Sequence, residues 1–363
     1  MKSPQHQESP KMTHPYCIES LQEKLKQLGL PFADVFARAL AALLTARKIS
    51  IHQITHLMPG ECNAEANRQQ IRRCLDHETL DESVWARAIA ALLPKQPWVL
   101  AMDRTEWKRG QTTINLLVLA VVVHGCAVPL LWTVMPDCGA SDTAERKALI
   151  GRFIALFGVS AVRFLTADRE FIGEDWVAWL LEQRLPFRIR IKAGEFLTDE
   201  KEVRQPAKEW FAKRACRCKP RTMNLWGLPV FVGGKRLHEG KYLIIISNER
   251  SKDLGEDYRL RWKIETLFQA LKGRGFDMES CRLSQEKRLS GWFGFLALGF
   301  CWCLRMGHCL DAYAPLPLKK HKRRAISVFA RGMRQLQALL APLVGRPSAY
   351  HFEIALELLE PIK

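Results

Sequence analysis

The order of the apolar segments in the second quarter of the chain constrains its fold more than any other feature. Buried strands are expected where apolar residues run together or alternate, and helices where they recur at helical spacing. Strand, hairpin, helix, strand, helix and strand follow one another, which predicts an α/β protein with a mixed sheet. The predicted strands cover residues 98–103, two strands within 112–135, 162–168 and 187–192, and the predicted helices cover 143–157 and 176–183.

Residues 116–134 are apolar for long enough to suggest a membrane span. A turn signal at His124 and Gly125, Pro129 and the many valines favour two paired, buried strands instead. Residues 292–303 are too few to span a bilayer and predict a core helix. With a polar N-terminus in place of an apolar leader, the sequence predicts a cytoplasmic protein with no membrane partner.

The eleven cysteines are therefore expected to be reduced. The pairs Cys216/Cys218 and Cys301/Cys303 lack the two-residue gap that is usual in zinc sites, and no paired histidines accompany them. Buried free thiols are favoured over a structural zinc ion.

Residues 1–94 are expected to be helical and to form a DNA-binding domain. Within residues 50–77, a short helix, a turn at Pro59 and Gly60 and a second helix resemble a helix-turn-helix, with Arg68, Arg72 and Arg73 as the candidate DNA contacts. The alternative is an ordinary solvated helix face. A net charge of +17 favours a polyanionic partner. Further predicted helices cover 18–28, 32–47 and 81–93, the last with Asp81 as its N-cap.

Four further segments follow. We expect residues 95–194 to form the first part of an α/β core, 195–254 a β-rich insertion, 255–310 the second part of the core and 311–363 a helical region that is a candidate for dimerisation. Predicted helices cover 289–305 and 326–343, and a basic run at 318–324 links them, either as a solvated run or as a phosphate contact.

Residues 257–276 predict one helix with two distinct faces. Its polar stripe holds Tyr258, Arg261, Glu265 and Lys272, and Gly273 with Gly275 is expected to end it. The apolar stripe beside it consists of Leu260, Ile264, Leu267, Phe268 and Leu271.

Asp103 and Asp168 each end an apolar strand of the predicted sheet, where the sites of open α/β sheets lie. Two carboxylates that meet there repel each other unless a cation holds them, and Mg²⁺ suits such oxygen ligands. Glu265 would be the third carboxylate. A strand-terminal aspartate is also common as a turn or cap residue. The rival acids are Asp137, Asp142, Asp175, Glu106 and Glu170.

The spacing Tyr258-x2-Arg261-x3-Glu265-x6-Lys272 matches the YREK signature of bacterial transposases of the fourth insertion-sequence family. The chain also resembles this family at Arg261-Trp262-x-Ile264-Glu265, in the segment Ala167-Asp168-Arg169-Glu170-Phe171 and at residues 327–332. The resemblance covers roughly residues 95–335. It implies a DDE active site on an RNase H-like fold.

The resemblance implies that Asp103, Asp168 and Glu265 bind two Mg²⁺ ions, for which Mn²⁺ substitutes. Tyr258, Arg261 and Lys272 would hold backbone phosphates of the transposon end. An i,i+4 ion pair between Arg261 and Glu265 is the alternative for the arginine. Arg190 and Lys192 are weaker phosphate candidates, because strand alternation alone predicts a basic outer face. Trp226, or Trp210, would stack on a flipped base, although either can be a core residue.

The resemblance further implies a cut-and-paste transposase that cleaves terminal inverted repeats through a DNA hairpin intermediate and joins the 3′-hydroxyl ends to target DNA. Two ends require at least a homodimer on the double-stranded DNA. The alternatives are a nuclease of the same fold without strand transfer and a non-catalytic DNA-binding descendant.

Overall fold

Two compact units make up the chain, one formed by Met1–Leu92 with Leu298–Lys363 and the other by Leu93–Ala297. The segment boundaries expected from the sequence, at residues 94, 194, 254 and 310, stay predictions. The computed structural model describes residues 14–46, 50–109, 112–136, 139–212, 220–237, 240–273, 275–283, 285–320, 324–340 and 349–362.

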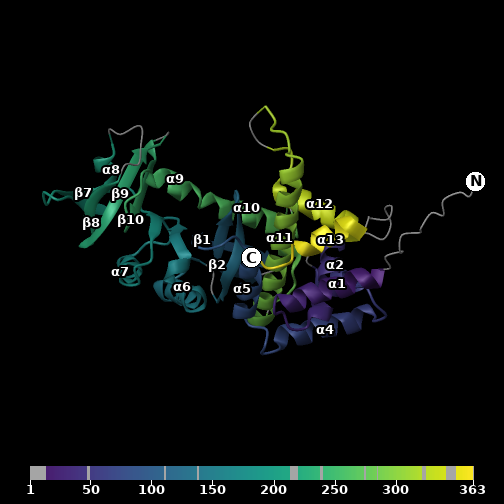
Figure 1. Ribbon diagram of the computed structural model, residues 1–363. Coiled ribbons are helices and arrows are strands. Elements are labelled where there is room, and N and C mark those ends of the chain that lie inside the picture. The colour runs from purple at the N-terminus through teal and green to yellow at the C-terminus, as the bar shows by residue number, and fades with distance from the viewer. Residues whose placement is uncertain are drawn as a thin grey trace, which may run out of the picture. The chain divides into compact units, whose positions relative to one another are not determined.

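The unit Leu93–Ala297 is built on one ten-stranded sheet, with strand order β3-β2-β1-β4-β5-β10-β9-β8-β6-β7 (Figure 1). Its strands are β1 Trp98–Arg109, β2 Thr112–Val123, β3 Cys126–Met135, β4 Val162–Ala167, β5 Phe187–Arg190, β6 Phe196–Thr198, β7 Arg204–Pro206, β8 Arg221–Leu225, β9 Leu228–Arg236 and β10 Tyr242–Ser247.

The first five strands confirm the predicted mixed α/β fold. β1, β2 and β3 are antiparallel neighbours, whereas β4 and β5 run parallel to β1. This is the strand arrangement of an RNase H-like core. The predicted hairpin is confirmed as well: His124 and Gly125 turn the chain with φ of 42° and 89°, and every residue from 116 to 121 in β2 is fully buried.

Asp103 does not end its strand as the sequence predicted. β1 continues to Arg109 because its polar second half stays paired with β2, from Arg104↔Leu117 to Arg109↔Thr112. What ends at this level is the pairing of β1 with β4, whose last pair is Met102↔Ala167. The apolar run therefore marked the end of β1's contact with β4 and not the end of the strand.

The helices of this unit are α6 Thr143–Phe157, α7 Glu174–Glu182, α8 Ala207–Trp210, α9 Leu254–Arg259 and α10 Trp262–Leu271, with short 3₁₀ turns at η1 Val159–Ala161 and η3 Met278–Ser280. α6 begins with a capping box, in which Asp142 accepts from Glu145 N–H and the Glu145 carboxylate accepts from Asp142 N–H. The rival acid Asp142 is thereby explained as a helix cap.

The prediction of a single helix over residues 257–276 is wrong, because two helices cover this stretch. Leu260 and Arg261 separate α9 from α10, and the turn is tightened by i→i+3 bonds such as Arg261 N to Tyr258 O at 3.0 Å. α10 does bury the expected apolar face, with Ile264, Leu267 and Leu271 fully covered. It packs on β1, β2 and β3.

The predicted β-rich insertion is confirmed as strands, and these strands extend the same sheet. β10 joins it to the core by antiparallel pairing with β5, in the register Ile245↔Arg190 and Ser247↔Arg188. Figure 1 shows β7, β8, β9 and β10 together, with α9 next to β9 and β10. The Cys216/Cys218 motif lies outside the described residues.

The second unit is helical. It contains α1 His14–Gln27, α2 Ala33–Ala46, α3 Ile51–Leu57, α4 Ala64–Asp76, α5 Glu82–Ala91, α12 Val328–Leu340 and α13 Ala349–Glu357, and the unit boundary falls within α11 Glu286–Tyr313. The helix–turn–helix succession of α3 and α4 and the Asp81 cap of α5 are confirmed. Cys301 and Cys303 are buried free thiols as predicted, and burial raises the pKa of Cys301 to about 12.

Within the described residues, α11 is the one helix long and apolar enough to cross a bilayer, but 78% of its most apolar stretch is buried inside the protein. It is longer than the core helix that the sequence predicted.

Candidate active site

Asp103 and Asp168 lie side by side on neighbouring strands. Each follows directly after the last residue pair between β1 and β4, Met102↔Ala167, so the parallel register brings the two aspartates to the same level of the sheet. Their side chains are 15% and 29% exposed. Each carboxylate accepts a hydrogen bond from the next backbone N–H, of Arg104 at 2.9 Å and of Arg169 at 2.7 Å.

Arg261 joins the third predicted acid to this pair. Its Nη1 donates to Asp103 Oδ2 at 3.2 Å and its Nη2 to Glu265 Oε1 at 2.6 Å. The guanidinium is almost fully buried, whereas the Glu265 carboxylate is half exposed. The i,i+4 ion pair that the sequence offered as an alternative is therefore present, and the same arginine also reaches across to the sheet.

Tyr258 and Arg190 contact the other aspartate. The Tyr258 hydroxyl donates to Asp168 Oδ1 at 2.9 Å, and Arg190 Nη1 lies 3.8 Å from the same oxygen. The tyrosine ring is 1% exposed and lies in an apolar cluster with Leu243, Ile245 and Leu254. The turn between α9 and α10 thus brings Tyr258 to one aspartate and Arg261 to the other.

The pKa values of the two aspartates are shifted in opposite directions. Burial raises the pKa of Asp103 to about 6, against the Arg104 N–H and the Arg261 charge, which lower it. Burial also raises the pKa of Asp168, but the Arg169 N–H, the Arg261 charge and the Tyr258 hydroxyl outweigh it and leave that pKa below its usual value. The site therefore holds one readily ionised aspartate beside one whose charge is costly.

A cleft of about 690 Å³ opens beside Asp103 and Glu265, between β1 and α10. Lys272 follows the last residue of α10 and lines this cleft, where its Nζ donates to Glu106 O at 2.7 Å and lies 3.9 Å from Glu279. The cleft is thus lined by the Asp103 and Glu265 carboxylates together with the Lys272 ammonium group. Its remaining lining residues are Arg104, Thr105, Glu106, Phe268, Gln269 and Gly273.

Asp103 and Asp168 fit a divalent cation in donor type and position. They are oxygen ligands at one level of the sheet, and a cation offsets the cost of charging the buried Asp103. In the part of the chain that the structure describes, no group of three or more His, Cys, Asp and Glu side chains lies close enough together to hold a metal ion. Between Asp103 and Glu265 lies the Arg261 guanidinium.

The remaining residues predicted to bind DNA make no recorded contact with the candidate acids in the described part of the chain. Lys192 is exposed just beyond β5, and Trp226 is half-buried in the turn between β8 and β9. Trp210, at the end of α8, is half-buried. In the helical unit, Arg68 pairs with Glu65, and Arg72 and Arg73 are exposed on α4.

The rival acids have other surroundings. Arg104 pairs with Glu106 at 3.0 Å and lies 3.5 Å from Glu170, and Asp175 lies in the first turn of α7. Asp137 is outside the described residues.

Sequence reasoning overlooked Arg188 and Asp257. Alternation in β5 predicted a basic outer face, but α9 packs against β5 and β10 and Arg188 is only 4% exposed. Two signals were available in the sequence. Arginines recur at every second position of β5, and an acid, Asp257, directly precedes Tyr258.

Comparison with known families agrees with this geometry. Residues 94–302, more than half of the chain, match the family model described as the transposase DDE domain. The chain belongs to the transposase DDE domain family. The protein is therefore a DDE transposase, a polynucleotidyl transferase that acts on DNA with divalent metal ions. A search of curated proteins found no match to this transposase.

Proposed function

We propose that this DDE transposase moves DNA by a cut-and-paste reaction and belongs to the fourth insertion-sequence family, with its YREK signature at Tyr258, Arg261, Glu265 and Lys272. It binds the terminal inverted repeats, cleaves them through a DNA hairpin and joins the 3′-hydroxyl ends to target DNA as a homodimer. We place it in the cytoplasm with no membrane partner. The observation that carries the proposal is the meeting of Asp103 and Asp168 beside the Arg261–Glu265 pair.

In this proposal Asp103, Asp168 and Glu265 hold two Mg²⁺ ions, for which Mn²⁺ substitutes. Bound there, the ions activate a water or a 3′-hydroxyl and stabilise the leaving oxygen of the phosphodiester. Asp103 and Asp168 are fixed by the sheet. Glu265 is on a half-exposed helix face, and it joins the set when Arg261 takes a DNA phosphate in its place.

Buried arginine nitrogens support phosphate binding at this site. Arg104, Arg190 and Arg261 all contact the candidate acids or their neighbours, and the Nε of each is buried with no hydrogen-bond partner among the described residues. A guanidinium offers five N–H donors in a fork that matches phosphate oxygens. Tyr258, Lys272 and the exposed Lys192 extend the proposed contact with the transposon end, and Trp226 is the proposed stacking partner of a flipped base.

The proposal is tested on a plasmid that carries the coding region with its natural flanking DNA. Purified protein with Mg²⁺ is expected to release the segment at its two ends, and Glu265→Gln is expected to abolish cleavage while DNA binding persists. Glu256→Gln is the matched control, since Glu256 lies exposed on α9 and its side chain pairs with Arg259, away from the candidate acids. Cleavage retained by Glu265→Gln would refute the assignment.

A second assay separates the alternatives. Pre-cut ends with free 3′-hydroxyls are incubated with a target plasmid, and strand transfer is expected. Cutting without joining would point to a nuclease of the same fold. Binding with neither reaction would point to a non-catalytic descendant.

A further inference from the structure

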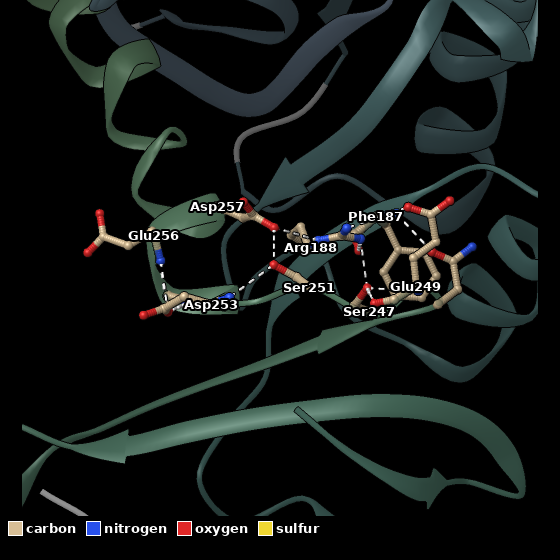
Figure 2. Close-up of polar contacts among 10 residues, drawn as sticks. Phe187, Arg188, Ser247, Glu249, Ser251, Asp253, Glu256 and Asp257 are labelled. Atoms are coloured by element: carbon tan, nitrogen blue, oxygen red, sulfur yellow. Dashed lines mark hydrogen bonds and ion pairs between the residues drawn. The ribbon is translucent and has the colours of Figure 1, made fainter. Parts of the chain in front are cut away.

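A buried arginine that the proposed reaction does not use lies behind the active site. Arg188, on β5, is 4% exposed. Its guanidinium meets Asp257 through Nε at 3.1 Å, Ser247 Oγ through Nη1 at 2.7 Å and Glu249 through Nη2 at 3.5 Å (Figure 2). It also lies over the ring of Phe164, 5.0 Å from the ring centre. A charge this deeply buried has to be matched by its partners.

The partners of Arg188 belong to three different elements. Ser247 ends β10, in register with Arg188, and Glu249 follows in the next turn, where its backbone exchanges two hydrogen bonds with the Ser247 hydroxyl. Asp257 belongs to α9. The guanidinium therefore ties α9 to two neighbouring strands of the sheet.

The N-terminus of α9 is held in the same network. Ser251 Oγ donates to Asp257 Oδ2 at 2.7 Å and accepts from Asp253 N–H at 3.2 Å, as Figure 2 shows. Asp253 in turn caps α9 by accepting from Gly255 and Glu256 N–H. One carboxylate oxygen of Asp257 thus connects the buried arginine to the helix start.

The residue after Asp257 is Tyr258, whose hydroxyl bonds Asp168, and Arg261 follows one turn later with its bonds to Asp103 and Glu265. Asp257 and Tyr258 are consecutive in one short helix, so a displacement of Asp257 displaces both the tyrosine and the start of the α9–α10 turn. Tyr258 is buried against Leu243 and Ile245, but apolar contacts are not directional and do not fix the orientation of its hydroxyl.

We propose that Arg188 is a positioning residue for the active site, which sets the place of α9 through its ion pair with Asp257 and so aligns Tyr258 and Arg261 with the acids. This inference rests on the proposed role of those acids in DNA cleavage. Arg188 itself touches neither DNA nor the reacting atoms. Its directional hydrogen bonds to Asp257 and Ser247 supply what the apolar cluster lacks.

Two carboxylates on the same guanidinium provide a matched pair of variants. Asp257→Asn and Glu249→Gln each remove one negative charge from Arg188, but only Asp257 lies on α9. With single-turnover cleavage at saturating DNA, which separates the rate constant from any change in DNA affinity, Asp257→Asn is expected to lower the rate constant about 10- to 100-fold, because a small misplacement has this effect. Glu249→Gln is expected to leave the rate near that of the unmodified protein.

A second readout does not depend on activity. The protein is labelled with 3-fluorotyrosine, and the Tyr258 resonance is assigned among the five tyrosines by its loss in Tyr258→Phe. Asp257→Asn is expected to shift this resonance and Glu249→Gln to leave it in place. Arg188→Met should reproduce the Asp257→Asn shift. The variant that combines Arg188→Met with Asp257→Asn should shift the resonance no further than either change alone, since both act through one contact.

Equal rate losses in Asp257→Asn and Glu249→Gln, or an unmoved Tyr258 resonance in Asp257→Asn, would overturn the inference. If Arg188→Met does not fold, the two carboxylate variants still decide it. If the unmodified protein does not cleave DNA, the proposed function fails, and the Tyr258 resonance still tests the positioning role.

Discussion

The two candidate aspartates carry their charges at different cost. Asp103 is the more buried of the two, and burial raises its pKa to about 6. In the unfolded chain this carboxyl would return to its usual value near 3.8. Between these values the folded protein holds the proton more tightly than the unfolded chain does. Stability therefore falls as pH rises from about 4 to 6, and the loss persists above that range.

Asp103→Asn should remove this penalty, because the amide carries no charge to bury. In buffer with a metal chelator, the free energy of unfolding at pH 8 should rise by about 1–3 kcal/mol relative to the unmodified protein, as a shift of roughly two pKa units implies. At pH 4 the two proteins should be nearly equal. Urea denaturation at both pH values measures this, and a stability gain of the same size at pH 4 would contradict it. With Asp103 as a metal ligand, as proposed above, such a variant would be more stable and unable to cleave DNA.

At the scale of elements, helix packing in the helical unit depends on glycine. A Cβ on Gly332 of α12 would lie 1.8 Å from Cys303 O of α11, and one on Gly307 would lie 2.0 Å from Val328 O. Atoms cannot approach so closely, so the two helix backbones meet where neither residue has a side chain.

Gly332→Ala should therefore force the two helices apart and destabilise the protein by about 1–3 kcal/mol. Gly151→Ala is the control. Gly151 lies inside α6 with no atom within 4 Å of the added Cβ, so alanine there should stabilise the protein by about 0.5–1 kcal/mol through its higher helix propensity. Thermal unfolding of both variants measures the contrast. A neutral Gly332→Ala would show that the crossing tolerates a side chain.

Local patterns in the sequence predicted elements well and the contacts between distant elements poorly. The period-two pattern identified β5, and helical spacing gave the buried face of α10. Neither pattern contains the break at Leu260 and Arg261, since both residues keep helical dihedral angles. The burial of Arg188 depends on α9, which is about 70 positions away, and no local pattern reports such a contact.

The candidate site shows the same division. Residue types and spacing made Asp103, Asp168 and Glu265 candidates among several rival acids, and the resemblance to the fourth insertion-sequence family selected them together with the cations. The partners could not be read in this way. Tyr258 bonds Asp168 and Arg261 bonds Asp103 only because the fold brings α9 and α10 beside β4 and β1. The strand prediction at Asp103 failed because β2 continues the pairing past the apolar run.

At the scale of the whole molecule, candidate DNA contacts occur in both compact units. Arg72 and Arg73 are exposed on α4 of the helical unit, whereas Lys272 lines the cleft in the unit Leu93–Ala297. With a net charge of +17, the protein should bind DNA largely through phosphate contacts that release counterions.

Arg72→Gln with Arg73→Gln and, separately, Lys272→Gln should each reduce the slope of log affinity against log salt, by about 0.9 for each phosphate that the variant no longer neutralises. At saturating protein only Lys272→Gln should slow cleavage, because only Lys272 lies beside the candidate acids. Binding titrations on the flanking DNA over a series of salt concentrations, followed by single-turnover cleavage, measure both effects. An unchanged slope in the α4 variant would remove α4 from the DNA interface.

The separation of the acids along the chain has a consequence for synthesis. Asp103 and Asp168 are 65 positions apart (168 − 103), and Glu265 follows 97 positions later (265 − 168). The ribosome thus completes β1, β4 and both aspartates long before β10, α9 and α10 exist. A product that stops before residue 254 would contain the two aspartates but lack Tyr258, Arg261 and Glu265. With Glu265 in its proposed role, premature termination should yield inert protein and not an unregulated nuclease.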